Sequence, residues 1–209
     1  MQTSSGTRRA LALAIRSATI PAALAGFLAA PLAVAPRANA AEAEAVKPIQ
    51  EPITGKEDLG DLSQPKQALA QFYKAFNTRD LKMIDDNFVA SDEVAIDNPL
   101  GGIRRGSDVA HKMYDGVFKS PADVRVEFWD YTIDRVGDVF WAVGRERGTY
   151  RDGAAVKNLA IRTTRIFRLI DGRWRQVHHH GSIEDEKLLA DYRNAVRSPK
   201  GAAQTQAPK

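Results

Sequence analysis

Two arginines interrupt the apolar faces of predicted strands, and they are the side chains with the clearest chemistry in this sequence. From Val139 every second residue is apolar until Arg145, and from Leu159 every second residue is apolar apart from Thr163 and Arg165. Because successive side chains of a strand point to opposite faces, this alternation predicts that both guanidinium groups point into the protein. A buried guanidinium needs a carboxylate of the protein or an anion from outside.

The last predicted strand adds two histidines to this site. Residues of one parity in that strand are Trp174, Gln176, His178 and His180. Together with the arginines, His178 and His180 are predicted to form the polar end of an apolar pocket, which is typical of a small-molecule site. The positive charge favours an anionic ligand, most simply a carboxylate.

The same residues allow structural interpretations. Arg145 could pair internally with Glu127, Asp97 or Glu146, and Arg165 could pair in the same way. The histidines could be core residues or face the solvent. A β-bulge would reverse the predicted faces, because one extra residue turns every later side chain to the other side.

Enzymatic chemistry is a second hypothesis. A carboxylate that lines the cavity could act as a general base if it reached the substrate proton. The chain has no cysteine, which excludes disulfides, thiol nucleophiles and cysteine-bound metals. His178 and His180 with one carboxylate form an incomplete ligand set, so we predict no metal site and no cofactor.

The basic character of the chain comes from its N-terminal part. The sequence has 30 basic and 26 acidic residues, and residues 1–40 contain no acid but the four arginines Arg8, Arg9, Arg16 and Arg37. The remaining 169 residues are therefore balanced in charge. This balance argues against a nucleic-acid-binding body.

Residues 1–40 are predicted to be a signal peptide. A basic start, an uncharged run rich in Ala and Leu over 17–36, and a small-x-small motif ending at Ala40 fit the expected pattern. Prolines in the apolar run argue against an uncleaved membrane anchor, although this alternative and the export route, general secretory or twin-arginine, stay open. The cleaved protein is expected to be periplasmic or secreted and to make no membrane contact.

The remainder is predicted to be a linker over 41–63, one domain over 64–197 and a disordered tail over 198–209. The domain begins with helical patterns, one of which has the apolar stripe Leu69, Phe72, Tyr73 and Phe76. Strand-like runs follow at 123–135, 138–150, 156–170 and 174–183, and a polar helix closes the domain at 184–196. Helices before a long meander predict an α+β fold, in which a strongly curved antiparallel sheet wraps around the first helices and leaves a cavity.

The final strands resemble the association (hub) domain of calcium/calmodulin-dependent kinase II. The segments that carry the resemblance are Thr164-Arg165-Ile166-Phe167 and Trp174-Arg-Gln-Val-His-His-His-Gly-Ser182. The wider group is the nuclear transport factor 2-like superfamily, with its SnoaL-like and ketosteroid isomerase branches. The resemblance covers 64–197 and implies a cone-shaped α+β fold with a deep pocket, assembled through its sheet into homo-oligomers, dimers or higher.

The resemblance also implies roles for particular residues. Hub arginines at the positions of Arg145 and Arg165 line a pocket for small carboxylates, His111 matches a pocket histidine, and Gly181 replaces a further pocket arginine. The first hypothesis is therefore an exported, self-associating domain that binds a small anionic or polar organic ligand. One alternative that the resemblance implies is a SnoaL-like or ketosteroid-isomerase-like enzyme, of isomerase or cyclase type, that uses a cavity carboxylate as its base; Asp97 is our first candidate for that catalytic role. The other alternative is an oligomerisation module with a vestigial cavity.

Overall fold

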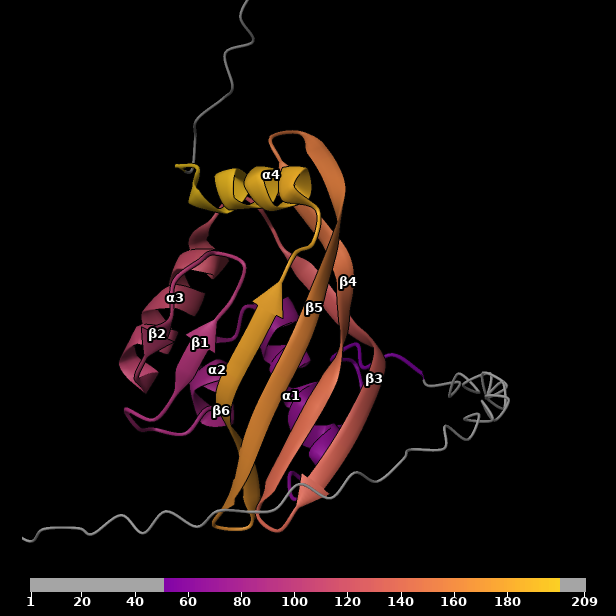
Figure 1. The fold of residues 1–209 in the computed structure, drawn as a ribbon, viewed down its shortest axis with the longest axis vertical. Helices are drawn as coiled ribbons and strands as arrows, with labels where there is room; N and C mark the ends of the chain where they lie inside the picture. The colour runs from indigo at the N-terminus through magenta and orange to yellow at the C-terminus, as the bar shows by residue number, and fades with distance from the viewer. Residues whose placement is uncertain (1–50, 200–209) are drawn as a thin grey trace, which may run out of the picture. The chain divides into compact units, whose positions relative to one another are not determined.

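The structure, a computed structural model, describes residues 51–199; the predicted signal peptide, the linker before residue 51 and the tail from residue 200 lie outside the described residues. The elements are, in order, α1 (Pro65–Thr78), α2 (Leu81–Asn87), β1 (Ala95–Asp97), β2 (Arg104–Arg105), α3 (Ser107–Lys119), β3 (Arg125–Val136), β4 (Val139–Asp152), β5 (Ala155–Ile170), β6 (Arg173–Ser182) and α4 (Glu186–Arg197). Figure 1 shows the curved sheet with α1 behind it and α4 lying across one end. The predicted α+β class, with helices before the meander and a closing helix, is confirmed.

The helices begin near the residues that their sequences predict, and the predicted apolar stripe of α1 is buried. Pro65 opens α1, where a missing amide hydrogen costs nothing, and the stripe Leu69, Phe72, Tyr73 and Phe76 is buried. The Asp185 side chain accepts a hydrogen bond from Leu188 N at 2.7 Å and caps α4. No helix between residues 51 and 199 combines the length and apolar character needed to cross a membrane.

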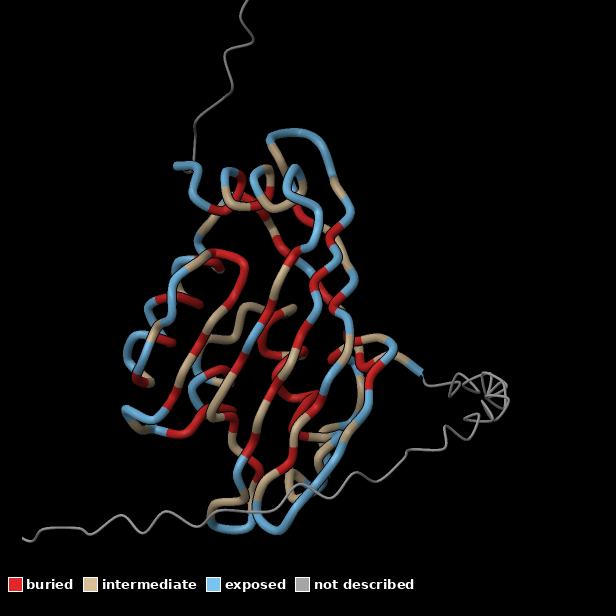
Figure 2. Tube along the Cα trace, viewed as in Figure 1, coloured by how far each residue is buried: buried red, intermediate tan, exposed pale blue. Residues whose placement is uncertain are grey.

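The long strands form a consecutive antiparallel meander within a six-stranded sheet of order β2-β1-β6-β5-β4-β3. The hairpins turn at Gly137, Gly153 and Gly172, which all have positive φ, a conformation that glycine adopts without strain. Burial alternates along the strands, as Figure 2 shows for β4 and β5. One face of the sheet therefore packs on the helices, and the other is largely open to solvent.

The inner face of the sheet and α1–α3 enclose an aromatic core. Phe140 stacks on Phe167 with ring centroids 4.5 Å apart, and Trp174 meets Phe140 edge-on at 4.9 Å. Tyr73 of α1 stacks on Phe128 of β3. This core ties the first helix to the sheet and fixes the side chains between them.

The described part of the predicted linker, residues 51–63, lies against the sheet rather than apart from it. Ile53 is fully buried, and its backbone exchanges hydrogen bonds with Phe128 of β3 in both directions, at 2.8 and 2.9 Å. A single bridge leaves no periodic pattern in the sequence, which is why the prediction of a flexible tether missed this contact.

Candidate functional site

Arg165 of β5 stands at the centre of a buried polar cluster on the inner face. Its side chain is 0% exposed; Nη2 donates to Glu146 Oε1 at 2.6 Å, Nη1 donates to Gln176 Oε1 at 2.8 Å, and Nε donates to the Tyr73 hydroxyl at 3.2 Å. The guanidinium carbon also lies 3.5 Å from the centroid of the Phe72 ring. The inward orientation predicted for Arg165 is confirmed.

The register of the sheet brings these groups together. Arg165 lies opposite Ala142 of β4, and Glu146 lies four residues further along β4, opposite Ile161. Directly opposed residues of an antiparallel pair share a face, so Glu146 points inward with Arg165. Tyr73 reaches the pair from α1 and donates its hydroxyl hydrogen to Glu146 Oε1 at 3.0 Å.

The cluster is balanced in charge. Burial opposes the charge of Arg165, but Tyr73 and Glu146 raise its pKa, so the guanidinium stays protonated. Burial raises the pKa of Tyr73 well above its usual value, so its hydroxyl remains a neutral donor. One cation and one carboxylate therefore neutralise each other inside the protein.

His179 and Tyr114 form a second buried pair. His179 is 5% exposed, and its Nδ1 lies 3.2 Å from the Tyr114 hydroxyl oxygen. Burial, reinforced by the charge of Arg165, lowers the pKa of His179 well below its usual value, and burial raises the pKa of Tyr114. A Tyr114 hydroxyl that donates to Nδ1 satisfies both groups and leaves the imidazole hydrogen on Nε2, which has no partner among residues 51–199.

These groups line a small cavity between the helices and the inner face. Its polar lining residues are Asn98, Tyr114, Glu146, Arg165, His179 and Tyr192, and the rest of its lining is mostly apolar. The cavity volume is about 30 Å³. That is room for two or three water molecules at roughly 10–15 Å³ each, and it is far below the approximately 300–1,000 Å³ of a ligand pocket.

Helix α4 closes this cavity. Its Tyr192 is buried in the lining and meets the Tyr150 ring edge-on, with centroids 5.5 Å apart. Arg193 Nε donates to the Pro99 carbonyl, and Arg197 Nη2 donates to the Leu100 carbonyl, both at 2.5 Å. A larger molecule could enter only if this end of the fold opened.

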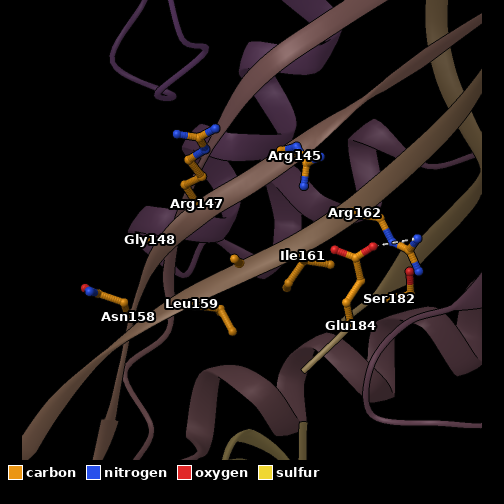
Figure 3. Close-up of a pocket in the computed structure, with 10 residues that line it drawn as sticks. Arg145, Arg147, Gly148, Asn158, Leu159, Ile161, Arg162, Ser182 and Glu184 are labelled. Atoms are coloured by element: carbon orange, nitrogen blue, oxygen red, sulfur yellow. Dashed lines mark ion pairs between the residues drawn. The ribbon is translucent and has the colours of Figure 1, made fainter. Parts of the chain in front are cut away.

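Arg145 lies on the outer face, and its predicted inward orientation is wrong. The inward residues of β4 are Phe140, Ala142 and Glu146, so Arg145 has the opposite parity and is exposed. It lines a pocket of about 460 Å³ along the sheet surface, near Arg147 and Arg162. Figure 3 shows these three arginines with Arg162 paired to Glu184 at 2.9 Å.

His178 and His180 also lie away from the interior cavity. Ile166 pairs with His178, but Phe167 pairs with Gln176, so Val177 is an extra residue that reverses the parity of β6. His179 therefore takes the inward position, while His180 is exposed and His178 is half-buried. Burial lowers the pKa of His178.

Asp97, the predicted base, is not among the residues that line the interior cavity. Ile96 is the fully buried residue of the short strand β1, so Asp97 turns to the opposite face. There it is half-buried beside β6, with its Cα opposite that of His180. Glu146 is the carboxylate that the fold places in the cavity.

His111 is exposed on α3, contrary to the position implied by the resemblance. Its Nδ1 lies 2.9 Å from Asp85 Oδ2 of the neighbouring helix α2. The buried face of α3 consists of Ala110, Met113, Tyr114 and Val117, which leaves His111 at its edge. Among residues 51–199, no group of three or more His, Asp or Glu side chains is placed to hold a metal ion.

Comparison with known proteins identifies relatives of this fold. A family model described as a SnoaL-like domain matches residues 66–186. An NTF2-like family protein from Streptomyces avermitilis has a TM-score of 0.53 and 17% identity over 58% of this chain and 94% of its own. A ketosteroid isomerase-like protein from Erwinia carotovora atroseptica has a TM-score of 0.50 and 19% identity over 59% and 96%.

A Thiobacillus denitrificans structure that carries the name of a calcium/calmodulin-dependent protein kinase type II association domain has 26% identity to this chain. Its TM-score is 0.49, over 58% of this chain and 96% of its own. No curated protein matches the sequence. The fold is therefore the NTF2-like fold that the sequence analysis expected.

Proposed function

Because the chain belongs to the SnoaL-like domain family and has the NTF2-like fold, we propose that its interior cavity binds a small polar organic molecule. The observation that carries this proposal is His179 Nε2, a buried ring nitrogen in the cavity lining that has no partner among residues 51–199. A buried donor without a partner costs about 1–3 kcal/mol, and a bound acceptor would recover that cost.

The cavity offers the ligand one donor and one acceptor. His179 Nε2–H would donate to a carbonyl oxygen. Glu146 uses Oε1 for both Arg165 and Tyr73, and no residue from 51 to 199 donates to its Oε2, which is left to accept from a hydroxyl group. Small hydroxycarbonyl compounds carry both functions.

The charge of the site favours a neutral ligand over the carboxylate expected from the sequence. That expectation rested on two inward arginines, whereas Arg145 is outside and Arg165 is neutralised by Glu146. An anion would have to lose its hydration without meeting an unbalanced cation. A neutral hydroxycarbonyl compound loses less on entering and keeps both hydrogen bonds.

Binding requires the closed end to open. Tyr192 of α4 forms part of the cavity wall, and the hydrogen bonds from Arg193 and Arg197 hold α4 in place. In this proposal the ligand replaces the volume of the Tyr192 ring. Tyr192→Ala should therefore strengthen binding by removing a competing side chain.

Thermal shift with small neutral hydroxyketones, such as hydroxyacetone, tests the proposal, and lactate, which is an anion, is the comparison compound that should stabilise the protein less. We expect stabilisation of the wild type and a larger shift for Tyr192→Ala. The shift should disappear in His179→Phe and remain in His180→Phe, a matched change on the outer face. No shift across the panel in either the wild type or Tyr192→Ala would refute the proposal.

Isomerase-type activity is a second candidate, favoured by the presence of a free carboxylate oxygen and an imidazole N–H in one cavity. His179 would polarise a carbonyl group, and Glu146 would take the proton from the adjacent carbon. Exchange of that proton in D₂O, followed by NMR with a cyclic ketone, would detect this activity. Exchange that does not exceed buffer, or that survives Glu146→Gln, would exclude it.

We extend the proposal to self-association and export. Partly exposed apolar side chains on the outer face, Trp141, Val143 and Ile166, favour a second copy as the covering partner. Light scattering measures the oligomeric state, and a dimer with no ligand response would favour a vestigial cavity.

The proposal of export rests on the sequence of residues 1–40 alone. N-terminal sequencing of periplasmic protein would test cleavage after Ala40.

A further inference from the structure

A larger cleft lies outside the interior cavity, at the edge of β3. Its volume is about 600 Å³, within the range of roughly 300–1,000 Å³ found for small-molecule sites. Its walls are the loop at 54–56, the end of α1 from Lys74 to Thr78, and residues of β3 and β4.

Asn77 joins the two walls of this cleft. Its side-chain amide donates to the Thr54 carbonyl at 3.1 Å and to the Val126 carbonyl at 2.8 Å, and its oxygen accepts from Val126 N at 3.1 Å. One side chain of α1 thus fixes both the loop and β3. The cleft is formed by the fold and does not depend on a bound molecule.

Glu57 fixes the loop itself. Its carboxylate accepts hydrogen bonds from Thr54 N at 2.6 Å and Gly55 N at 2.7 Å. Burial raises the pKa of Glu57, but these backbone hydrogen bonds outweigh burial and hold the pKa below its usual value. Gly55 has φ +81° and lies so close to α1 that a Cβ would overlap the backbone of Tyr73 and Lys74.

The cleft is positively charged. Its lining has one acid, Glu127, against the four cations Lys56, Lys74, Arg125 and Arg147. Arg125 pairs with Asp123 and Arg147 pairs with Asp130, but neither lysine has an ion-pair partner among residues 51–199. Two cations are therefore available to an anion from outside.

An aromatic surface completes the site. Trp129 of β3 lines the cleft and is only half-buried. The guanidinium carbon of Arg147 lies 5.7 Å from the centroid of a Trp129 ring. An aromatic ring can stack on such an indole while a neighbouring cation attracts its anionic group.

We propose that this cleft is a second ligand site, for a small organic anion that carries an aromatic ring. Lys56 and Lys74 bind the anionic group, and Trp129 packs against the ring. The cleft complements the interior cavity, whose charge is internally balanced and whose volume excludes such a molecule.

Isothermal titration calorimetry at low salt tests the site with 1-naphthyl phosphate and 1-naphthoate, which distinguish phosphate from carboxylate. We expect at least one to bind, and both 1-naphthol and inorganic phosphate to bind about tenfold more weakly or not at all, since each lacks one of the two recognised groups. Trp129→Leu should weaken binding of the naphthyl anion and leave that of inorganic phosphate unchanged.

The lysines are tested against a matched pair. Lys56→Gln with Lys74→Gln should weaken binding about tenfold or more, whereas Lys82→Gln with Lys112→Gln, which changes the net charge equally at exposed sites of α2 and α3, should not. Equal weakening by both pairs would mean non-specific attraction and would overturn the proposal. No binding of either naphthyl anion at millimolar concentration, or loss of binding in Arg145→Gln, would also overturn it.

Discussion

An arginine on the inner face of the sheet and one on the outer face differ in their burial and in their partners. On the inner face, Arg165 is 0% exposed and donates hydrogen bonds to the buried side chains of Glu146, Gln176 and Tyr73. On the outer face, Arg145 is exposed and has no ion-pair partner among residues 51–199. The two side chains have the same chemistry and lie on neighbouring strands, but only that of Arg165 is buried.

This difference determines what each charge can do. A buried pair is costly to break, because the remaining partner stays charged in a medium that cannot solvate it. An exposed charge is screened and contributes little to stability, but it remains available to a ligand. The buried pair is therefore suited to fixing the positions of the side chains around it, and the exposed arginines are suited to binding other molecules.

The largest predicted effect separates these two arginines directly. Arg165→Met leaves Glu146 buried without its counter-ion and should lower the free energy of unfolding by about 3–5 kcal/mol. Arg145→Met should change it by no more than about 0.5 kcal/mol. Urea denaturation followed by circular dichroism measures both, and equal losses would contradict the distinction between the faces.

The next prediction concerns the pair as a unit. Combining Arg165→Met with Glu146→Leu removes both buried charges, so the double variant should regain about 2 kcal/mol or more of the loss seen in Arg165→Met. A double-mutant cycle in urea gives the coupling. If the two losses simply add, the ion pair is not what makes Arg165 necessary.

The buried His179 should make the protein less stable in acid. The pKa of His179 is lowered by burial and by Arg165, His178 and His180, so below pH 6.5, its usual pKa, the unfolded chain takes up a proton that the folded chain does not. Stability should therefore fall with falling pH, by at most about 1.4 kcal/mol per pH unit for this group. His179→Phe should reduce this slope between pH 6.5 and 5 in urea denaturation, and an unchanged slope would contradict the prediction.

A smaller effect is expected at the hydroxyl group that holds His179. Tyr114→Phe leaves Nδ1 buried without its donor and should cost about 1–2 kcal/mol. Thr132→Val, at an exposed position on β3, should stay within about 0.5 kcal/mol. Thermal unfolding compares the two, and a neutral Tyr114→Phe would remove the argument for the Nε2–H tautomer.

The smallest effect on stability is expected for a substitution on the outer face, and that substitution should act on dimer formation instead. Val143 is 46% exposed, so Val143→Lys should change the unfolding free energy of the monomer by no more than about 0.5 kcal/mol. The same change should dissociate a dimer formed through the sheet. Light scattering measures the mass of both proteins. If the wild type is a dimer and Val143→Lys has the same mass, the contact lies on another surface.

The fold could be predicted closely because its signals are local. The helical stripe beginning at Leu69, the glycines at the hairpins and the change of period near residue 123 each need only a few neighbouring residues. The four long strands β3–β6 lie within a few residues of those predicted, whereas the two-residue strand β2 falls in a segment that was expected to be a loop. Arg165 was oriented correctly because its strand has a clear difference between its two faces.

The face of β4 was predicted wrongly because both of its faces are apolar near its start. Val139, Trp141 and Val143 occupy one parity, whereas Phe140 and Ala142 occupy the other and are the buried ones. A usable signal lay further along the chain. Counting back from the Gly153 turn pairs Ala142 with Arg165, which places Glu146 inside.

The histidines were misplaced for a different reason. The extra residue at Val177 follows from the three-dimensional pairing of β5 with β6, and no turn residue or glycine marks it in the sequence. Asp97 and His111 were placed by analogy with relatives, and the packing of Ile96 and of α3 orients them otherwise. Contacts between distant segments, such as Ile53 with Phe128, leave no local pattern either.

The bulge at Val177 also sets how β6 would respond to a change in length. Deleting this one residue would let the ladder continue without interruption and would leave the faces unchanged, because His178 already pairs with Ile166 and His179 with Arg165. Drawing Val177 into a regular ladder would instead turn His178 and His180 toward the helices and send His179 to the solvent side. Two imidazoles would then occupy inward positions that now hold His179 and Gly181, where even a Cβ would lie 3.1 Å from Ile161.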